Sequence, residues 1–191
     1  MPLFSQLEFR YAVHQIADMP PDQGAEVAFA GRSNAGKSTA INALANRRKL
    51  AFVSKTPGRT QALNFFDMGN HCFLVDLPGY GYAAVPGREQ ERWSELISTY
   101  IINRNSLKLL VLVADARHGI TPLDHYLLDW LAPTGKPVHV LLTKADKLTR
   151  QQATAALKAA ATELARHPVE SSVQIFSGLR KTGIREAQAA V

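Results

Sequence analysis

Short apolar runs alternate along this chain with segments in which apolar residues recur every three or four positions. The run at residues 107–114 is almost continuously apolar, as expected for a central parallel strand that is covered on both faces. Leu96, Ile97 and Tyr100, in contrast, have the spacing of one helix face. Six strands are predicted in this way, at residues 26–30, 63–68, 71–77, 107–114, 138–142 and 173–176.

Helix start signals stand between the predicted strands. Thr121 followed by Pro122 supplies a capping residue and a proline for the first helical turn. Thr149 is suited to cap an alanine-rich helix, and two further helices are predicted to begin near Lys37 and Thr182. Strands and helices therefore alternate almost throughout, which is typical of a parallel-rich sheet with helices on both faces.

The pattern also predicts how the sheet departs from a purely parallel one. Gly69-Asn70 lies between two predicted strands and is a hairpin signal, so one strand is expected to run antiparallel. Residues 1–25 form a weakly patterned arm. We therefore expect a single domain over residues 1–191, with a three-layer α/β/α fold and a mostly parallel six-stranded sheet that has one antiparallel edge strand.

Composition adds limits on the class of protein. The 191 residues are 46% hydrophobic and 20% charged, which is ordinary for one globular domain. A single cysteine, Cys72, excludes an internal disulfide, and no apolar run is long enough for a membrane span, so a cytoplasmic protein is expected. The net charge of +6 favours polyanionic partners such as RNA, although such an excess also keeps a protein soluble and helps to hold phosphates.

The segment GRSNAGKS at residues 31–38 matches a phosphate-binding pattern between a predicted strand and a predicted helix. Its glycines let successive backbone N–H groups point at phosphate oxygens, and the following helix adds the positive end of its dipole. In this pattern Lys37 reaches the β- and γ-phosphates, and Ser38 ligates Mg²⁺. The segment therefore predicts that a nucleoside phosphate binds here with Mg²⁺.

Two shorter motifs follow at the ends of predicted strands and narrow the choice of ligand. In the segment DLPG at residues 76–79, the acid is placed to hold Mg²⁺ through water and Gly79 to donate its N–H to the γ-phosphate. In the segment TKAD at residues 143–146, Asp146 is placed to accept hydrogen bonds from guanine N1–H and the 2-amino group together. Adenine lacks that pair of donors, so the ordered motifs predict GTP or GDP.

Further residues support this interpretation. Thr60 is placed to reach Mg²⁺ and the γ-phosphate, and residues 176–178 to present backbone N–H groups to guanine O6. The residues expected to contact the nucleotide are Gly31, Arg32, Ser33, Asn34, Ala35, Gly36, Lys37, Ser38, Thr39, Gly58, Arg59, Thr60, Gln61, Ala62, Asp76, Leu77, Pro78, Gly79, Thr143, Lys144, Ala145, Asp146, Phe176, Ser177 and Gly178. Of these, Lys37, Thr60 and Gly79 are expected to act in catalysis, and Ser38 and Thr60 to ligate Mg²⁺.

The ordered set resembles the EngB-type ribosome-biogenesis GTP-binding proteins, which belong to the TrmE-Era-EngA-EngB-septin class of P-loop GTPases. The blocks that carry the resemblance, which covers roughly residues 8–185, are GRSNAGKS at 31–38, TPGRTQ at 56–61, DLPGYGY at 76–82, LTKADK at 142–147 and FSGLRKTG at 176–183. The chain departs from that family in two places: Gly178 stands where Ser or Ala is usual, and the sequence stops at Val191, before the usual end of the last helix.

The resemblance implies a P-loop GTPase fold and a cytoplasmic GTPase that helps to assemble the large ribosomal subunit. Its partners would be that subunit or its precursor, through rRNA and ribosomal proteins, and its loss would disturb cell division and septation. We expect a monomer that contacts neither membrane nor DNA.

Two residues bear on hydrolysis. Ras-like GTPases orient the attacking water with a glutamine directly after the DLPG-type motif, and here that position is Tyr80. Slow intrinsic hydrolysis, accelerated by a ribosomal partner or another group, is therefore expected. An asparagine at the position of Asn34 holds K⁺ near the transferring phosphate in related GTPases, where a cation stabilises developing charge; alternatively, Asn34 simply fits the loop turn.

Two functional hypotheses stay open at the level of sequence. In one, GTP hydrolysis drives release from a pre-ribosome; in the other, GTP stabilises a conformation that docks on RNA and turnover is incidental. Tyr80 modestly favours the second. The loops at about residues 47–62 and 77–88 are the expected switches, and Lys49, Lys55 and Arg59 in the first are expected to contact rRNA.

Overall fold

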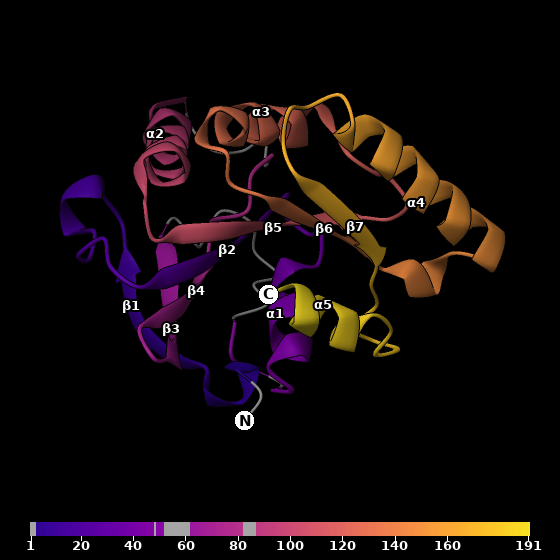
Figure 1. The fold of residues 1–191 in the computed structure, drawn as a ribbon, viewed down its shortest axis with the longest axis horizontal. Coiled ribbons are helices and arrows are strands. Elements are labelled where there is room, and N and C mark those ends of the chain that lie inside the picture. The colour runs from indigo at the N-terminus through magenta and orange to yellow at the C-terminus, as the bar shows by residue number, and fades with distance from the viewer. Residues whose placement is uncertain (1–2, 48, 52–61, 82–86) are drawn as a thin grey trace.

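The computed structural model describes residues 3–47, 49–51, 62–81 and 87–191 of the chain. Its centre is a seven-stranded sheet with the strand order β1-β3-β4-β2-β5-β6-β7 (Figure 1). The strands are β1 (Glu8–Val13), β2 (Ala25–Gly31), β3 (Leu63–Gly69), β4 (Cys72–Asp76), β5 (Leu107–Asp115), β6 (Val138–Thr143) and β7 (Ser171–Ile175). The α-helices are α1 (Lys37–Leu44), α2 (Gly87–Asn103), α3 (Pro122–Leu131), α4 (Arg150–Leu164) and α5 (Ile184–Ala190).

Helices cover both faces of the sheet. Helices α2, α3 and α4 lie on one face, and α1 and α5 lie on the other (Figure 1). The buried apolar side chains separate in the same way into two clusters, one with Tyr100, Leu128 and Leu164, the other with Ile41 and Ala187. The three-layer α/β/α fold class predicted from the sequence is confirmed.

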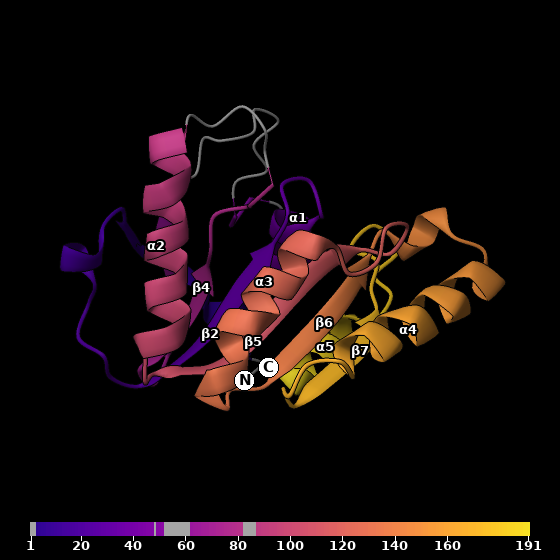
Figure 2. The same cartoon turned by 90° about the horizontal axis from the view of Figure 1, so that it is seen from above.

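The parallel part of the sheet explains the continuous apolar runs. Strand β2 pairs in parallel with both β4 and β5, and β6 pairs in parallel with β5 and β7. Every residue of β6 is buried, because helices cover both faces of a central strand. Figure 2 shows the loops that follow β2, β5 and β6 gathered at one edge of the sheet. The motifs at the ends of these strands are thereby brought together.

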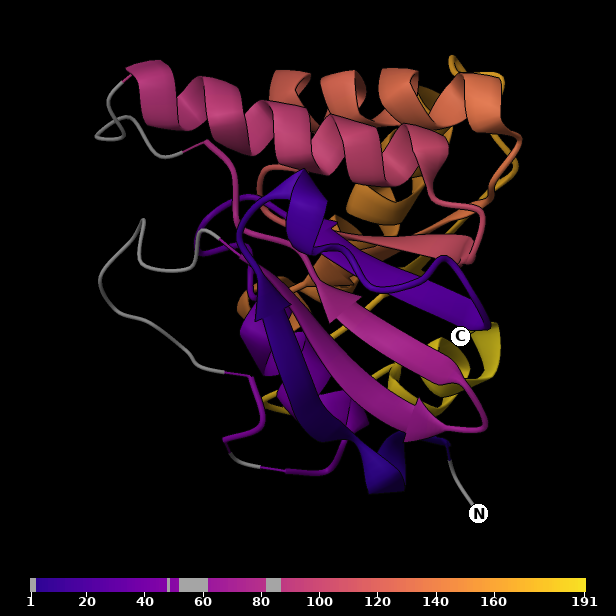
Figure 3. The same ribbon diagram turned by 90° about the vertical axis from the view of Figure 1, so that its left-hand side faces the viewer.

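The strand count expected from the sequence is one too low, because Glu8–Val13 forms β1. This strand pairs antiparallel with β3 at the outer edge of the sheet, with Val13 opposite Leu63 (Figure 3). Strand β3 is also antiparallel to β4, so it runs opposite to both of its neighbours. Only Val13 of β1 is buried, although Phe9, Tyr11 and Val13 alternate with Glu8, Arg10 and Ala12, so a short strand pattern was present in the sequence.

Three predicted helix starts agree with the observed ones, whereas α5 begins at Ile184, two residues after the predicted start at Thr182. Helix α1 begins at Lys37, as expected. At the start of α3 the backbone N–H of Thr121 donates to the Asp124 carboxylate at 2.7 Å. At the start of α4 the N–H of Gln152 donates to the Thr149 hydroxyl at 3.3 Å. These caps satisfy backbone groups that the first helical turn leaves without partners.

Short 3-10 helices complete the structure, at Leu3–Gln6, Ile16–Asp18, Ala132–Thr134 and Ala145–Lys147. The first of them belongs to the arm at residues 1–25, which packs on the domain through the buried side chains of Phe4 and Leu7. No helix within the described parts of the chain is long and apolar enough to cross a membrane.

Candidate functional site

The loop at residues 31–38, the P-loop, connects β2 to α1 at the edge where the parallel strands end. Gly36 has φ 102°, a left-handed conformation, and directly precedes the helix. A Cβ at Gly36 would lie 3.3 Å from the Thr143 hydroxyl, so glycine also allows the close approach of β6. The N-terminus of α1 and its backbone N–H groups therefore face the space where phosphates are expected.

Lys37 forms an ion pair with the carboxylate of Asp76, the last residue of β4. Both side chains are largely buried, so each charge holds the other where water is scarce. A bound phosphate would compete with Asp76 for the Lys37 ammonium. The Asp76 carboxylate would then be free to interact with a cation. The Ser38 hydroxyl, one residue into α1, and the Asp76 carboxylate are hard oxygen donors of the kind that Mg²⁺ prefers. The residues present thus fit a magnesium ion, which Ser38 would ligate directly and Asp76 through water.

The DLPG segment and the residue after it contact the P-loop and the adjoining strand β2 through backbone hydrogen bonds. The N–H of Ser33 donates to the carbonyl of Tyr80 at 2.8 Å, and the N–H of Leu77 donates to the carbonyl of Phe29 at 2.9 Å. A Cβ at Gly79 would lie 3.2 Å from the Ser33 hydroxyl, so only glycine allows this close approach without displacement. The segment expected to sense the γ-phosphate is therefore adjacent to the loop expected to bind it.

Tyr80, directly after this segment, is 7% exposed and belongs to the core. Its hydroxyl donates to the Asp124 carboxylate of α3 at 2.5 Å. The other carboxylate oxygen of Asp124 accepts from the N–H and the hydroxyl of Thr121, each at 2.7 Å. Burial raises the pKa of the Tyr80 phenol well above its usual value. The phenol is thus neutral and engaged with α3.

The TKAD segment at residues 143–146 lies beside the P-loop. The Thr143 hydroxyl contacts the carbonyls of Ala35 and Ala114. Lys144 has φ 57°, a conformation that residues with a side chain seldom adopt, and its ammonium group donates to the carbonyl of Asn34 at 2.6 Å. The side chain of Lys144 therefore runs from the TKAD segment, the expected base-recognition segment, to the P-loop.

Asp146 is held by the loop that follows β7. The Ser177 hydroxyl donates to its Oδ1 at 2.7 Å, and this hydrogen bond lowers the pKa of the Asp146 carboxyl. The carboxylate is 8% exposed and keeps the accepting capacity of Oδ2. An ionised carboxylate fixed in this way is suited to accept the two donors on the guanine edge.

Gly178 lies close to the first helix. A Cβ there would lie 2.9 Å from the methyl group of Thr39 and 3.3 Å from its carbonyl oxygen. Serine or alanine at this position would therefore require the Thr39 side chain to rotate. The departure from the family pattern at Gly178 thus has a steric reason in this chain.

The structure brings together the sequence-predicted residues at 31–39, 76–79, 143–146 and 176–178 at one edge of the sheet. Ala62 is buried directly before β3. Gly58, Arg59, Thr60 and Gln61, and with them the expected catalytic and metal-ligating role of Thr60, lie outside the described residues. The nucleotide contacts of all these residues stay predictions.

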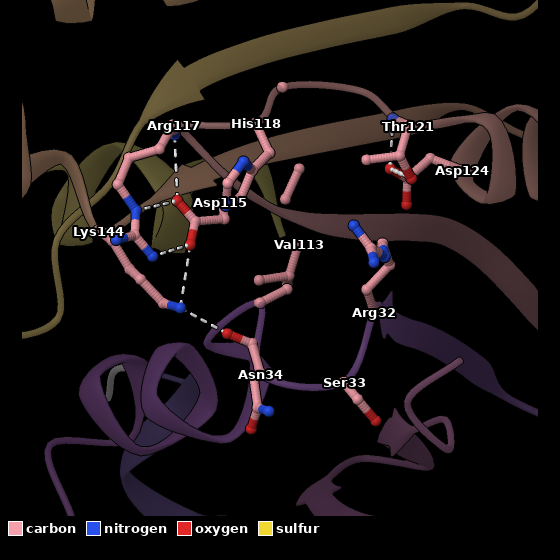
Figure 4. A pocket seen from close by; sticks show the side chains of 13 residues that line it. Arg32, Ser33, Asn34, Val113, Asp115, Arg117, His118, Thr121, Asp124 and Lys144 are labelled. Atoms are coloured by element: carbon pink, nitrogen blue, oxygen red, sulfur yellow. Dashed lines mark hydrogen bonds and ion pairs between the residues drawn. The ribbon is translucent and has the colours of Figure 1, made fainter. Parts of the chain in front are cut away.

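Asp115 and Arg117 lie next to the expected site but were not predicted from the sequence. They line a cavity of about 220 Å³ between the P-loop and the loop that joins β5 to α3, together with Arg32, Asn34 and Lys144 (Figure 4). One signal was available in the sequence: Asp115, like Asp76, is an acidic residue at the end of an apolar strand. The sequence offers no motif that marks Asp115 as a partner of Lys144.

Known proteins share both the sequence and the fold. The profile of a family described as "50S ribosome-binding GTPase" matches residues 26–144. A protein named "Probable GTP-binding protein EngB" from Azoarcus sp. (strain BH72) is 55% identical over 192 residues, which cover 100% of this chain and 92% of the relative. A protein of the same name from Methylobacillus flagellatus is 52% identical over 191 residues, with coverages of 100% and 92%.

Two solved structures show the likeness of fold. The "Crystal structure of a probable GTP-binding protein engB" has a TM-score of 0.68 at 26% identity and covers 86% of this chain and 95% of its own. Era in complex with MgGDPNP and nucleotides 1506–1542 of 16S ribosomal RNA has a TM-score of 0.67 at 22% identity, with coverages of 88% and 55%.

Proposed function

This chain belongs to the EngB group of the 50S ribosome-binding GTPase family, and from that premise we propose that it is a GTP-operated switch in the assembly of the large ribosomal subunit. The observation that carries the proposal is the meeting of four motifs at one edge of the sheet. Residues 31–38 and 76–79 supply groups for phosphates, and residues 143–146 and 176–178 supply groups for guanine.

The proposed binding mode follows from these groups. Backbone N–H groups of the P-loop, the start of α1 and the ammonium of Lys37 would hold the phosphates. Asp146, kept ionised by Ser177, would accept from guanine and exclude adenine. Mg²⁺, when bound at Ser38 and Thr60, would neutralise charge on the β- and γ-phosphates.

We infer that hydrolysis is slow without a partner. The groups placed to act on the γ-phosphate are Lys37, Thr60 and the N–H of Gly79. Tyr80 is at the position where a water-orienting glutamine stands in Ras-like proteins, and its hydroxyl is engaged with Asp124 of α3. A phenol in this hydrogen bond cannot orient water at the P-loop, which supports slow intrinsic turnover.

K⁺ at Asn34 is a further part of the proposal. Asn34 has φ 66°, and its amide is directed away from Lys144 (Figure 4). Asparagine tolerates this left-handed conformation well, so the residue also suits the turn without any ion. We expect GTP hydrolysis to be faster in KCl than in NaCl at equal ionic strength, and equal rates would remove the ion from the mechanism.

The ribosomal partner is tested by co-sedimentation. The protein is incubated with separated ribosomal subunits in GDP and in a non-hydrolysable GTP analogue. We expect it to sediment with the large subunit or its precursor, and more of it in one nucleotide state than in the other. Equal recovery with small subunits, or none with large ones, would contradict the proposal.

A second candidate function, a GTP-dependent rRNA-binding module with incidental turnover, is favoured by the buried Tyr80. The two functions differ in one measurement, the kcat for GTP with and without ribosomal particles. Stimulation supports the switch, and an unchanged kcat together with nucleotide-dependent binding supports the module. In either case, we propose a cytoplasmic monomer whose depletion disturbs ribosome assembly first and septation afterwards.

We propose rRNA contacts through the basic residues of the first switch. Of these, Lys49 is exposed, while Lys55 and Arg59 lie outside the described residues. Contacts with phosphates release counterions, so binding to ribosomal particles should weaken as salt is raised. Binding that is insensitive to salt would contradict this part of the proposal.

A further inference from the structure

We propose that Asp115 is a positioning residue that fixes Lys144 between the base-recognition segment and the P-loop. The inference rests on the proposed binding of guanine nucleotides. The carboxylate Oδ2 of Asp115 lies 3.0 Å from the Lys144 ammonium, which also donates to the carbonyl of Asn34 at 2.6 Å. One ammonium group thus joins the end of β5 to the phosphate-binding loop (Figure 4).

The carboxylate of Asp115 is itself held firmly. Its Oδ1 accepts from the backbone N–H and from Nε of Arg117, both at 3.0 Å, and its Oδ2 accepts from Nη2 of Arg117 at 2.7 Å. Burial opposes ionisation, yet the hydrogen bonds from Arg117 and Lys144 outweigh it and hold the pKa of Asp115 well below its usual value. Lys144 therefore faces a permanent negative charge in a fixed place.

A fixed lysine matters because its side chain is long. An unrestrained lysine loses much of its rotamer freedom when it is immobilised, and this loss of entropy opposes binding. Asp115 immobilises Lys144 before any ligand arrives, so the nucleotide would bind to a preformed surface. The same contact fixes the carbonyl of Asn34 and with it the shape of the P-loop. Asp115 therefore links base recognition to phosphate binding without touching the nucleotide.

Asp115→Asn is the sharpest substitution for testing this role. The amide keeps Oδ1 as an acceptor for the backbone N–H of Arg117, so the local turn is preserved. It removes the charge that faces Lys144. We expect the dissociation constant for GDP to rise about tenfold. The matched control is Asp129→Asn on α3, which alters a carboxylate that is 63% exposed and should leave the dissociation constant at the wild-type value.

A double-mutant cycle separates positioning from a general structural effect. Lys144→Met keeps the apolar stem but removes the ammonium group. If Asp115 acts through Lys144, the double variant binds GDP no more weakly than Lys144→Met alone. An equal loss from Asp115→Asn in both backgrounds, or no loss in the wild-type background, would overturn the proposal.

Two controls keep the outcome interpretable. Thermal unfolding of the nucleotide-free variants shows whether Asp115→Asn folds. If it does not, Asp115→Glu takes its place in the cycle; it keeps the charge but moves it by one methylene, so a smaller loss of GDP affinity is expected, and that loss should again vanish in the Lys144→Met background. Binding of GDP by the wild-type protein is measured before the cycle. If the wild-type protein does not bind GDP, the proposed function itself is contradicted, and not the role of Asp115.

Discussion

A single carboxylate, Asp146, is expected to decide which base binds. Its Oδ1 is occupied by Ser177, and a guanine bound here would place two donors against the carboxylate. In Asp146→Asn, the side-chain NH₂ group would face the N1–H and the 2-amino group of guanine, which are also donors. GDP affinity should therefore fall by about 10³-fold or more. Xanthosine diphosphate, which carries an acceptor at position 2, should gain relative to GDP. Competition binding with both nucleotides measures the change, and equal losses for both would contradict this role.

The hydrogen bond from Ser177 to Asp146 also predicts a pH dependence. Because the pKa of the folded Asp146 is lowered, its ionised form contributes stability above the ordinary carboxyl pKa, and that contribution is lost as pH falls through the lowered value. Ser177→Ala removes the main cause of the shift. We expect GDP binding by this variant to weaken at a higher pH than in the wild type. Overlapping pH profiles of affinity would show that the hydroxyl does not tune Asp146.

At the scale of elements, the hydrogen bond between Tyr80 and Asp124 joins the segment after β4 to α3. Tyr80→Phe removes this buried bond while Asp124 keeps its contacts with Thr121. We expect a loss of ~1 kcal/mol in the free energy of unfolding and a Tm lower by about 2–4 °C. Tyr126→Phe, which alters a tyrosine 61% exposed on the same helix, is the matched control and should leave Tm unchanged.

A buried ionic cluster joins β2 to the end of α2, away from the phosphate-binding edge. Nη2 of Arg104 lies 2.6 Å from Oε1 of Glu26, and the side chains are 7% and 1% exposed. Removing one partner of a buried pair leaves an unpaired charge, so Arg104→Met should cost ~3–5 kcal/mol in the free energy of unfolding. Urea unfolding measures this. The exposed pair between Arg166 and Glu163 provides the comparison, because Arg166→Met should cost less than ~1 kcal/mol.

Most elements could be predicted from the sequence because their patterns are local. The central strands were recognised from apolar runs, and α3 and α4 from the caps at Thr121 and Thr149. Strand β1 was missed although Phe9, Tyr11 and Val13 alternate with Glu8, Arg10 and Ala12, because the pattern covers only six residues and the partner strand β3 lies some fifty residues further along. Its existence depends on an edge that only the folded sheet provides.

At the scale of the whole molecule, the N-terminal arm is part of the domain. Phe4, Leu7 and Val13 are buried, and β1 covers the backbone groups of β3 that would otherwise form an exposed edge. Removing residues 1–14 should therefore lower the free energy of unfolding by several kcal/mol and promote aggregation. Urea unfolding and light scattering test this against Arg10→Ala, which changes only an exposed side chain of β1. Wild-type stability of the shortened chain would contradict the expectation.

The sequence by itself determined the alternation of strands and helices, the order of the motifs and the chemistry of the expected ligand. Each of these depends on residues that are close together in the chain. Only the tertiary structure decided the contacts that join distant segments. Lys144 meets Asn34 across 110 positions, and Tyr80 meets Asp124 across 44. Such partners follow from the order and register of strands in the sheet, which bring the ends of β2, β5 and β6 to one edge. For this reason, the positioning role of Asp115 emerged from the fold and not from any motif.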